Sequence, residues 1–317
     1  MSQSKTSNNF FVNNCLYVIW CIIYFLLTWG FMTMVVFRMW LPKYYLMSLY
    51  ERTWSMGAIY QESFLVSAML YLVSLSIAFS NLGEAILRFV NRVRKLETKQ
   101  EINYLGPIFS DVYKEAVKQY PKLKNVRPYI IDGMYINACA LGRQTVAVTK
   151  GAIESLSEEE LKGFIAHEFG HIAHGDTVAL LLTTVGNGIF TVFVIITQTI
   201  VNILSSVLDK RGIVGFLTGL IRILLSIILV AFLYIGEVVL AINSRSNEYA
   251  ADRFAFELGH GDDLVEALYL LQGMCISDKA KIVDRLKASH PHIAKRISRL
   301  EMMIDGKDKP LNSVLYR

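Results

Sequence analysis

Four apolar stretches constrain the fold of this 317-residue chain more than any other feature of its sequence. They run over residues 16–37, 64–82, 178–204 and 213–242, and each is long enough to cross a bilayer as a helix. Hydrophobic residues make up 53% of the chain and the mean hydropathy is +0.39, which is too apolar for two soluble domains. The stretches therefore predict a mainly α-helical integral membrane protein with four transmembrane helices.

Basic residues around the first two stretches predict how the chain is oriented. No small-residue cleavage pattern follows the first stretch, so we expect a retained transmembrane helix and not a signal peptide. Arg88, Arg92, Arg94 and Lys95 follow the second stretch, and such a basic cluster marks the cytoplasmic side. We therefore expect the N-terminus and everything after residue 88 to face the cytoplasm.

Charge and cysteine usage exclude two other classes of protein. The net charge is +5, and no Lys/Arg run of the kind that grips nucleic acid is present, so no nucleic-acid partner is expected. The four cysteines include no C-x-x-C pair, and two of them lie in or beside an apolar stretch. This favours a reducing, cytosol-facing domain over a disulfide framework.

The sequence His167-Glu168-Phe169-Gly170-His171 is typical of a metal site on a helix. Residues four apart share one helix face, so both imidazoles can bind one ion while Glu168 acts on a water molecule. Ser157 and Glu160 form a capping box before this segment, and Gly175 follows its last apolar turn. The five residues alone are also compatible with a surface histidine pair, so a third ligand is needed.

Glu248 is the candidate for that third ligand. It lies in a helix-forming run that returns from the hairpin formed by the third and fourth apolar stretches. Asp252 lies one turn further on and can accept the free N–H of a ligating histidine. His174 also shares the stripe of His167, but a metal between His167 and His171 would be about a turn away from it, roughly 5 Å along the axis.

Residues 127–153 are rich in β-branched and aromatic side chains and are broken by Asp132-Gly133 and Gly142-Arg143, which predicts strands joined by tight turns. Before them, helical spacing over 101–120 ends at Pro121. We expect residues 145–149 to form an open sheet edge that pairs with an extended peptide. Its substrate-binding residues would be Thr145, Val146, Ala147 and Val148. An ordinary edge strand covered by a loop is the alternative.

Together with the two-helix insertion, the segments HEFGHIAHGD, SRSNEYAADRFA, NACALG and SHPHIAKRISRL resemble the HtpX-type membrane zinc metalloproteases, which are relatives of the CAAX prenyl endoproteases. The resemblance covers nearly the whole chain up to about residue 300. It implies a zincin-like (gluzincin) α+β protease domain with a small sheet and one zinc ion per chain. By this resemblance His167, His171 and Glu248 are the zinc ligands, Glu168 is the catalytic base and Asp252 orients a ligand.

Two further residues match positions of the family that help to hold substrate or to stabilise the oxyanion. These are Asn137 in the NACA segment and His290 before Pro291. His290 is equally compatible with a cap on the helix that follows. Cys139 departs from the family, which usually has a bulkier residue there. Glu237, inside the fourth apolar stretch, either pairs with a neighbour or lines a polar cavity.

These features divide the chain into a membrane part and a protease part that are interleaved. We expect a polar tail over 1–15, two transmembrane helices over 16–87, two more over 178–243, and a flexible tail over 305–317. The protease domain would then consist of residues 88–177 and 244–304.

The predicted function is a membrane-integrated zinc endopeptidase of the cell membrane that cleaves membrane or misfolded proteins at the cytoplasmic surface. Its partners would be a protein or peptide substrate and membrane lipid. One alternative is a CAAX-type or other maturation protease with narrow substrates, which a broad substrate panel would separate. The other is a non-catalytic membrane protein whose zinc site is structural, which would require a fourth protein ligand such as His174.

Overall fold

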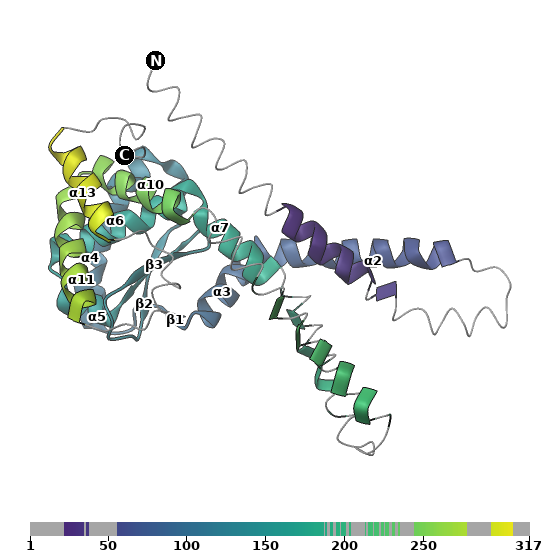
Figure 1. The fold of residues 1–317 in the computed structure, drawn as a ribbon. Coiled ribbons are helices and arrows are strands. Elements are labelled where there is room, and N and C mark those ends of the chain that lie inside the picture. The colour runs from purple at the N-terminus through teal and green to yellow at the C-terminus, as the bar shows by residue number, and fades with distance from the viewer. Residues whose placement is uncertain are drawn as a thin grey trace, which may run out of the picture. The chain divides into compact units, whose positions relative to one another are not determined.

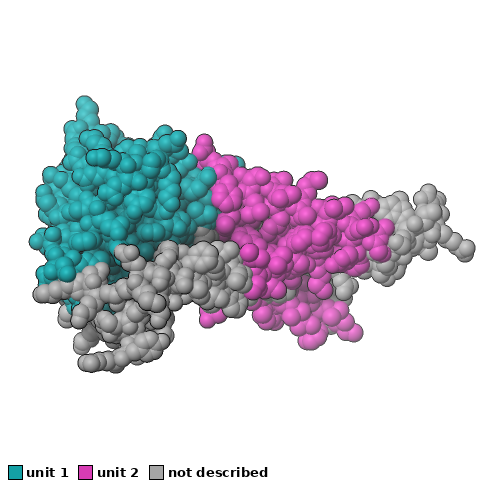
Figure 2. Space-filling model, turned by 90° about the horizontal axis from the view of Figure 1, so that it is seen from above, with its two compact units in different colours: residues 1–17, 82–181, 240–317 teal, residues 18–81, 182–239 magenta. Residues whose placement is uncertain are grey.

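The computed structural model describes residues 22–34, 36–37, 56–186, 244–277 and 293–306, together with scattered residues between 188 and 234 (Figure 1). The described residues fall into two units, which are coloured separately in Figure 2. Unit 1 contains residues 82–181 and the described residues from 244 onward, and unit 2 contains the described residues of 22–81 and 182–234.

Unit 1 is built on a four-stranded sheet with the strand order β1-β2-β4-β3. The strands are β1 (Val93–Arg94), β2 (Arg127–Ile131), β3 (Ala138–Leu141) and β4 (Thr145–Thr149). β2 and β4 are parallel, whereas β1 pairs with β2 and β3 pairs with β4 in antiparallel fashion. The predicted strands are confirmed within 127–149, and so is the tight turn at 142–143. Residues 150–153 are helical instead, and β2 is joined to β3 by residues 132–137 and does not pair with it, while β1 was not predicted.

The predicted edge strand is wrong. β4 lies between β2 and β3, and all five of its residues are buried. Its Thr-Val-Ala-Val-Thr pattern suggested a strand with one polar face, but both threonine hydroxyls are used inside the protein. Thr145 accepts a hydrogen bond from Arg88, and Thr149 donates to the carbonyl of Tyr135. Among the described residues, the edge strand on this side of the sheet is β3.

Helices cover this sheet around one central helix, α6 (Glu158–His174). α6 contacts β3 and β4, and it also contacts α4 (Lys99–Gln119), α10 (Ser244–Glu257) and α11 (Gly261–Ser277). α13 (Ile293–Ile304) packs on α10 and α11. The core between helices and sheet is apolar and includes fully buried Leu105, Ile130, Val146 and Phe169. The shorter elements are α3 (Asn81–Val90), η1 (Pro121–Leu123), α5 (Lys150–Ser155) and α7 (Asp176–Leu181).

The helix boundaries follow the caps that the sequence contains. Ser157 and Glu160 form the predicted capping box of α6, and Gly175 ends α6 in the left-handed conformation at φ 82°. Thr98 and Glu101 form a second capping box at the start of α4, which Pro121 follows. Each box satisfies two backbone N–H groups that a helix start would leave without a partner.

Unit 2 contains α2 (Met56–Ala78), an apolar helix over Ile22–Met34 and the π-helical turn η2 (Leu182–Gly186). Polar side chains join them: Trp29 Nε1 donates to Ser67 Oγ at 3.1 Å, and Ser74 Oγ donates to the carbonyl of Gly186 at 2.6 Å. Among the described residues, one helix is long and apolar enough to cross a membrane, Gly57–Ala78. It starts before the predicted residue 64 and ends before residue 82.

Four transmembrane helices therefore remain a prediction. The first, third and fourth predicted stretches are described only in part. Glu237, the polar N-terminal tail and the residues of the last tail beyond 306 lie outside the described residues.

Candidate functional site

Three side chains from two helices of unit 1 meet at one point. α6 supplies His167 and His171, and α10 supplies Glu248. His167 Nε2 lies 3.2 Å from His171 Nε2 and 3.4 Å from Glu248 Oε2, and His171 Nε2 lies 3.6 Å from Glu248 Oε1. His167 and Glu248 are buried, and His171 is partly exposed.

These distances fit a tetrahedral metal ion. Two ligands at zinc distances of 2.0–2.2 Å, separated by a tetrahedral angle, lie about 3.4 Å apart. The three atom pairs, at 3.2, 3.4 and 3.6 Å, are close to this value, with each Glu248 oxygen facing one histidine. Within the described part of the chain this is the one group of three or more His, Cys, Asp or Glu side chains with such geometry. His174 does not join it: its ring packs edge-on against Phe254, with the ring centroids 6.1 Å apart.

Carboxylates fix the tautomer of both histidines. His167 Nδ1 lies 3.0 Å from Asp252 Oδ1, and His171 Nδ1 lies 3.0 Å from Asp176 Oδ2. Each Nδ1–H is thereby donated to a carboxylate, which leaves both Nε2 lone pairs directed at the common centre. The structure brings Asp252 to His167 as the sequence suggested. Asp176, two residues after His174, was not foreseen as the partner of His171.

Arg296 on α13 is a second residue of this cluster that the sequence reasoning missed. Its guanidinium donates to Asp252 through Nε at 3.0 Å and through a terminal nitrogen at 2.6 Å, and its other terminal nitrogen lies 3.0 Å from Glu248 Oε2. The side chain is buried. A signal was available, because Arg296 occupies a position in the apolar stripe formed by Ile293, Ile297 and Leu300. A charged residue in such a stripe needs a buried partner.

Electrostatics within this cluster favour a protonated His167 when no metal is present. Burial lowers the pKa of His167, but its hydrogen bonds to Asp252 and Glu248 outweigh burial and raise the pKa to about 9. Burial also acts to raise the pKa of Asp252, yet Arg296 and His167 outweigh that effect and lower it. A cation bound between the ligands would replace the proton of His167.

Glycines allow the helices to approach closely enough for this geometry. A Cβ at Gly170, the residue before His171, would lie 2.8 Å from the Cα of Ala251 on α10. At Gly163, a Cβ would lie 2.5 Å from the backbone nitrogen of Leu264 on α11. The small residue inside the His-Glu-Phe-Gly-His segment therefore sets the distance between the ligand-bearing helices.

Edge strand β3 runs beside the catalytic-base candidate Glu168. Glu168 is buried, and burial together with the Glu168 carboxylate raises the pKa of the Cys139 thiol on β3 to about 12. Asn137 immediately precedes β3 and is exposed, and its backbone N–H donates to Thr149 Oγ1 at 3.0 Å. His290 lies outside the described residues.

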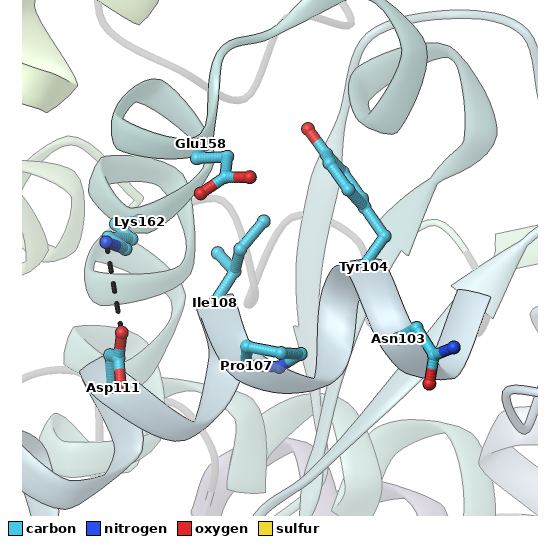
Figure 3. Close-up of a pocket in the computed structure, with 7 residues that line it drawn as sticks. All are labelled: Asn103, Tyr104, Pro107, Ile108, Asp111, Glu158 and Lys162. Atoms are coloured by element: carbon cyan, nitrogen blue, oxygen red, sulfur yellow. Dashed lines mark ion pairs between the residues drawn. The ribbon is translucent and has the colours of Figure 1, made fainter. Parts of the chain in front are cut away.

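A shallow pocket elsewhere in unit 1 does not contain any of these residues (Figure 3). It lies between α4 and the start of α6, where Lys162 Nζ is 3.9 Å from Asp111 Oδ2. It is lined by Asn103, Tyr104, Pro107, Ile108, Asp111, Glu158 and Lys162. The candidate site is thus the metal-ligand cluster and not this pocket.

Comparison with known proteins gives the following matches. Residues 99–304 match the model of Peptidase family M48. The curated "Protease HtpX homolog" of Bacillus subtilis (strain 168) is 30% identical over 183 residues, covering 52% of this chain and 59% of the relative. The "Protease HtpX homolog" of Bacillus pumilus is 32% identical over 190 residues, which cover 54% of this chain and 62% of the relative. "Protease HtpX" of Buchnera aphidicola subsp. Schizaphis graminum is 28% identical over 213 residues, which cover 59% of this chain and 71% of the relative.

The chain thus spans less than two thirds of the length of the first two relatives. Among solved structures, the crystal structure of S. mikatae Ste24p aligns with 94% of this chain and 67% of its own chain. The TM-score of that alignment is 0.48 and the sequence identity is 19%.

Proposed function

This chain belongs to peptidase family M48 and resembles its HtpX-type members, and we propose that it is a membrane-integrated zinc endopeptidase. The observation that carries the proposal is the cluster of His167, His171 and Glu248 beside Glu168. Among the described residues the cluster has three protein ligands and no fourth. Structural zinc sites use four protein ligands, whereas catalytic sites use three and leave one position open. This favours catalysis over a structural zinc site.

The residues divide the chemistry between them. Zinc held by Nε2 of both histidines and by the Glu248 carboxylate would activate a water molecule and polarise the scissile carbonyl. Glu168, adjacent to His167 but outside the ligand set, accepts the proton of the water and passes it to the leaving amine. Asp252, Asp176 and Arg296 hold the ligands in place, since each touches a ligand side chain.

Edge strand β3 is the substrate-recognition element in this proposal. Because β2 and β3 already occupy both edges of β4, a peptide cannot pair with Thr145, Val146, Ala147 or Val148. An extended peptide that pairs with the outer edge of β3, which no described strand occupies, would lie beside Glu168, and main-chain pairing requires little of the peptide's sequence. Asn137 at the start of β3, and His290 by resemblance, are the candidates for holding substrate or stabilising the oxyanion.

The four apolar stretches of the sequence and the apolar helix Gly57–Ala78 support a membrane location in this proposal. We propose that the catalytic unit faces the cytoplasm and that substrates are membrane or misfolded proteins. The two helices that carry the zinc ligands, α6 and α10, flank the third and fourth apolar stretches in sequence, so the zinc would lie near the membrane surface. A membrane-tethered peptide should then be cleaved faster than its soluble copy.

The decisive experiment separates the base from the ligands. The full chain is purified in detergent, its zinc content is measured, and cleavage of casein and of the chain itself is followed beside a Glu168→Gln variant. We expect one zinc per chain in both proteins and a loss of cleavage of about a hundredfold or more in the variant. Glu159→Gln, an exposed position on the same helix, is the matched control and should retain activity. Loss of zinc in Glu168→Gln would overturn the assignment of its role.

A further inference from the structure

Helix α3 has one buried face and one exposed apolar face. Gly83, Glu84 and Leu87 are buried. Leu82, Phe89 and Val90 are exposed by 57%, 85% and 58%. They lie on one helix face because Phe89 and Val90 follow Leu82 by seven and eight residues, which is about two helical turns. Ala85 and Ile86 continue that stripe. A ten-residue helix thus presents a strip of large apolar side chains to its surroundings.

Contacts on the buried face of α3 fix the rotation of the helix about its axis, so the apolar strip stays on the exposed side. The Glu84 carboxylate accepts a hydrogen bond from the backbone N–H of Arg143 at 2.6 Å, in the turn between β3 and β4. Arg88 donates to Thr145 Oγ1 at 3.1 Å, and its guanidinium lies 5.0 Å from the centre of the Tyr129 ring. Three separate contacts therefore fix which side of α3 faces outward.

Two observations indicate what covers the strip. First, α3 begins three residues after the last residue of the candidate membrane span, Ala78, so the chain can carry its start at most about 11 Å from the end of that span. Second, Arg92 and Lys95 follow the helix and are exposed, and within the described residues no ion pair holds either of them. Apolar side chains flanked by cations are the pattern of a helix that lies in an anionic lipid surface.

We propose that the outer face of α3 lies in the headgroup region of the bilayer, with Phe89 as its most deeply inserted side chain. The proposal rests on the membrane location proposed above. Because Glu84 and Arg88 hold the β3–β4 hairpin from the opposite face of the same helix, lipid contact at α3 would also fix the position of edge strand β3. The bilayer surface would thus help to place the strand on which an extended substrate pairs.

The test places an environment-sensitive fluorophore on the strip of the full-length chain. The four native cysteines are changed to alanine, Phe89→Cys is labelled with a nitrobenzoxadiazole dye, and the protein is reconstituted in phosphatidylcholine and phosphatidylglycerol nanodiscs. Lipids carry a nitroxide either near the headgroup or near the end of the acyl chain. The matched control is a label at Lys114→Cys on α4, where the native side chain is 71% exposed.

We expect the label at residue 89 to emit at shorter wavelength than the control. It should be quenched by the nitroxide near the headgroup and little by the deep one, as fits a depth of about 5–10 Å. A water-like emission in a chain that resists carbonate extraction would overturn the role of α3 while leaving the membrane protease intact. Release of the chain by carbonate would instead overturn the membrane location, and α3 with it. Shorter-wavelength emission without lipid quenching would show a protein partner on the strip and also overturn the proposal.

Discussion

Removing the Arg296 side chain should change zinc affinity in opposite directions in the native chain and in an Asp252→Ala variant. In the native site the guanidinium shields Asp252 and holds Glu248, so Arg296→Met should lower zinc affinity. In an Asp252→Ala background, the remaining ion pair of Arg296 among the described residues is with Glu248. The guanidinium then competes with the metal for that carboxylate. Removing it there should raise zinc affinity.

The expected changes in zinc affinity follow from two contacts of Asp252: it orients His167, and it pairs with the Arg296 guanidinium. Loss of a carboxylate that orients a ligating histidine costs about 10–100-fold in metal affinity. A buried charge left without its partner costs about 3–5 kcal/mol, and each 1.4 kcal/mol corresponds to a factor of ten. Asp252→Ala should therefore lower zinc affinity more than about a hundredfold. Adding Arg296→Met removes the unpaired charge and should recover at least about tenfold.

Zinc affinity of the detergent-solubilised full chain would be measured by competition with a chelator for the native protein, both single variants and the double variant. Lys295→Met, an exposed position one residue away on α13, is the matched control and should leave the affinity unchanged. If Arg296→Met lowers affinity by the same factor in both backgrounds, the two residues act independently and the reasoning is refuted.

Three further predictions follow from the same geometry. The pKa of metal-free His167 is raised to about 9, so below that pH zinc must displace the His167 proton. Zinc affinity should therefore rise about tenfold per pH unit towards pH 9 and then level off. A zinc affinity that does not change with pH in chelator competition would contradict this. Gly170→Ala should force α10 away and lower zinc content, whereas Gly106→Ala, which has nothing within 4 Å of its added Cβ, should not. Gly142→Ala should lower the melting temperature more than Gly175→Ala. Both glycines have positive φ, but only a Cβ at residue 142 would meet a neighbour, the Glu84 carboxylate at 2.5 Å. Equal shifts in melting temperature would show that backbone strain alone determines the loss of stability.

Local sequence signals predicted the elements of the site well. The capping box at Ser157 and the left-handed Gly175 bound α6, because caps act on backbone groups within one turn. The four-residue spacing placed His167 and His171 on one face for the same local reason. Glu248 was found through its place after the apolar hairpin, and the structure brings its carboxylate within 3.6 Å of both histidines.

What the sequence left open depends on contacts between distant segments. Strand order is such a property: β4 looked like an edge because its pattern alternates, yet β2 and β3 flank it on both sides. Arg296 became visible as a site residue only when α13 was packed against α10, since its partners lie about 45 residues earlier in the chain. The partnership of Asp176 with His171 depends on how the chain turns after Gly175, which spacing alone does not determine.

The arrangement of the ligands couples the metal to the fold. His171 and Glu248 lie on opposite sides of the apolar hairpin in sequence, so closing the site brings together two helix ends that the chain connects only through that hairpin. Without a cation, Glu248, Asp252, His167 and Arg296 share a buried space, and the hydrogen bonds of the two carboxylates favour a protonated His167. Zinc binding would replace that proton and hold α6 to α10 at the close approach that Gly170 permits. The free energy of zinc binding is therefore also free energy of association between these two helices, and removing zinc should increase hydrogen exchange in α10 more than in α4, which carries no ligand.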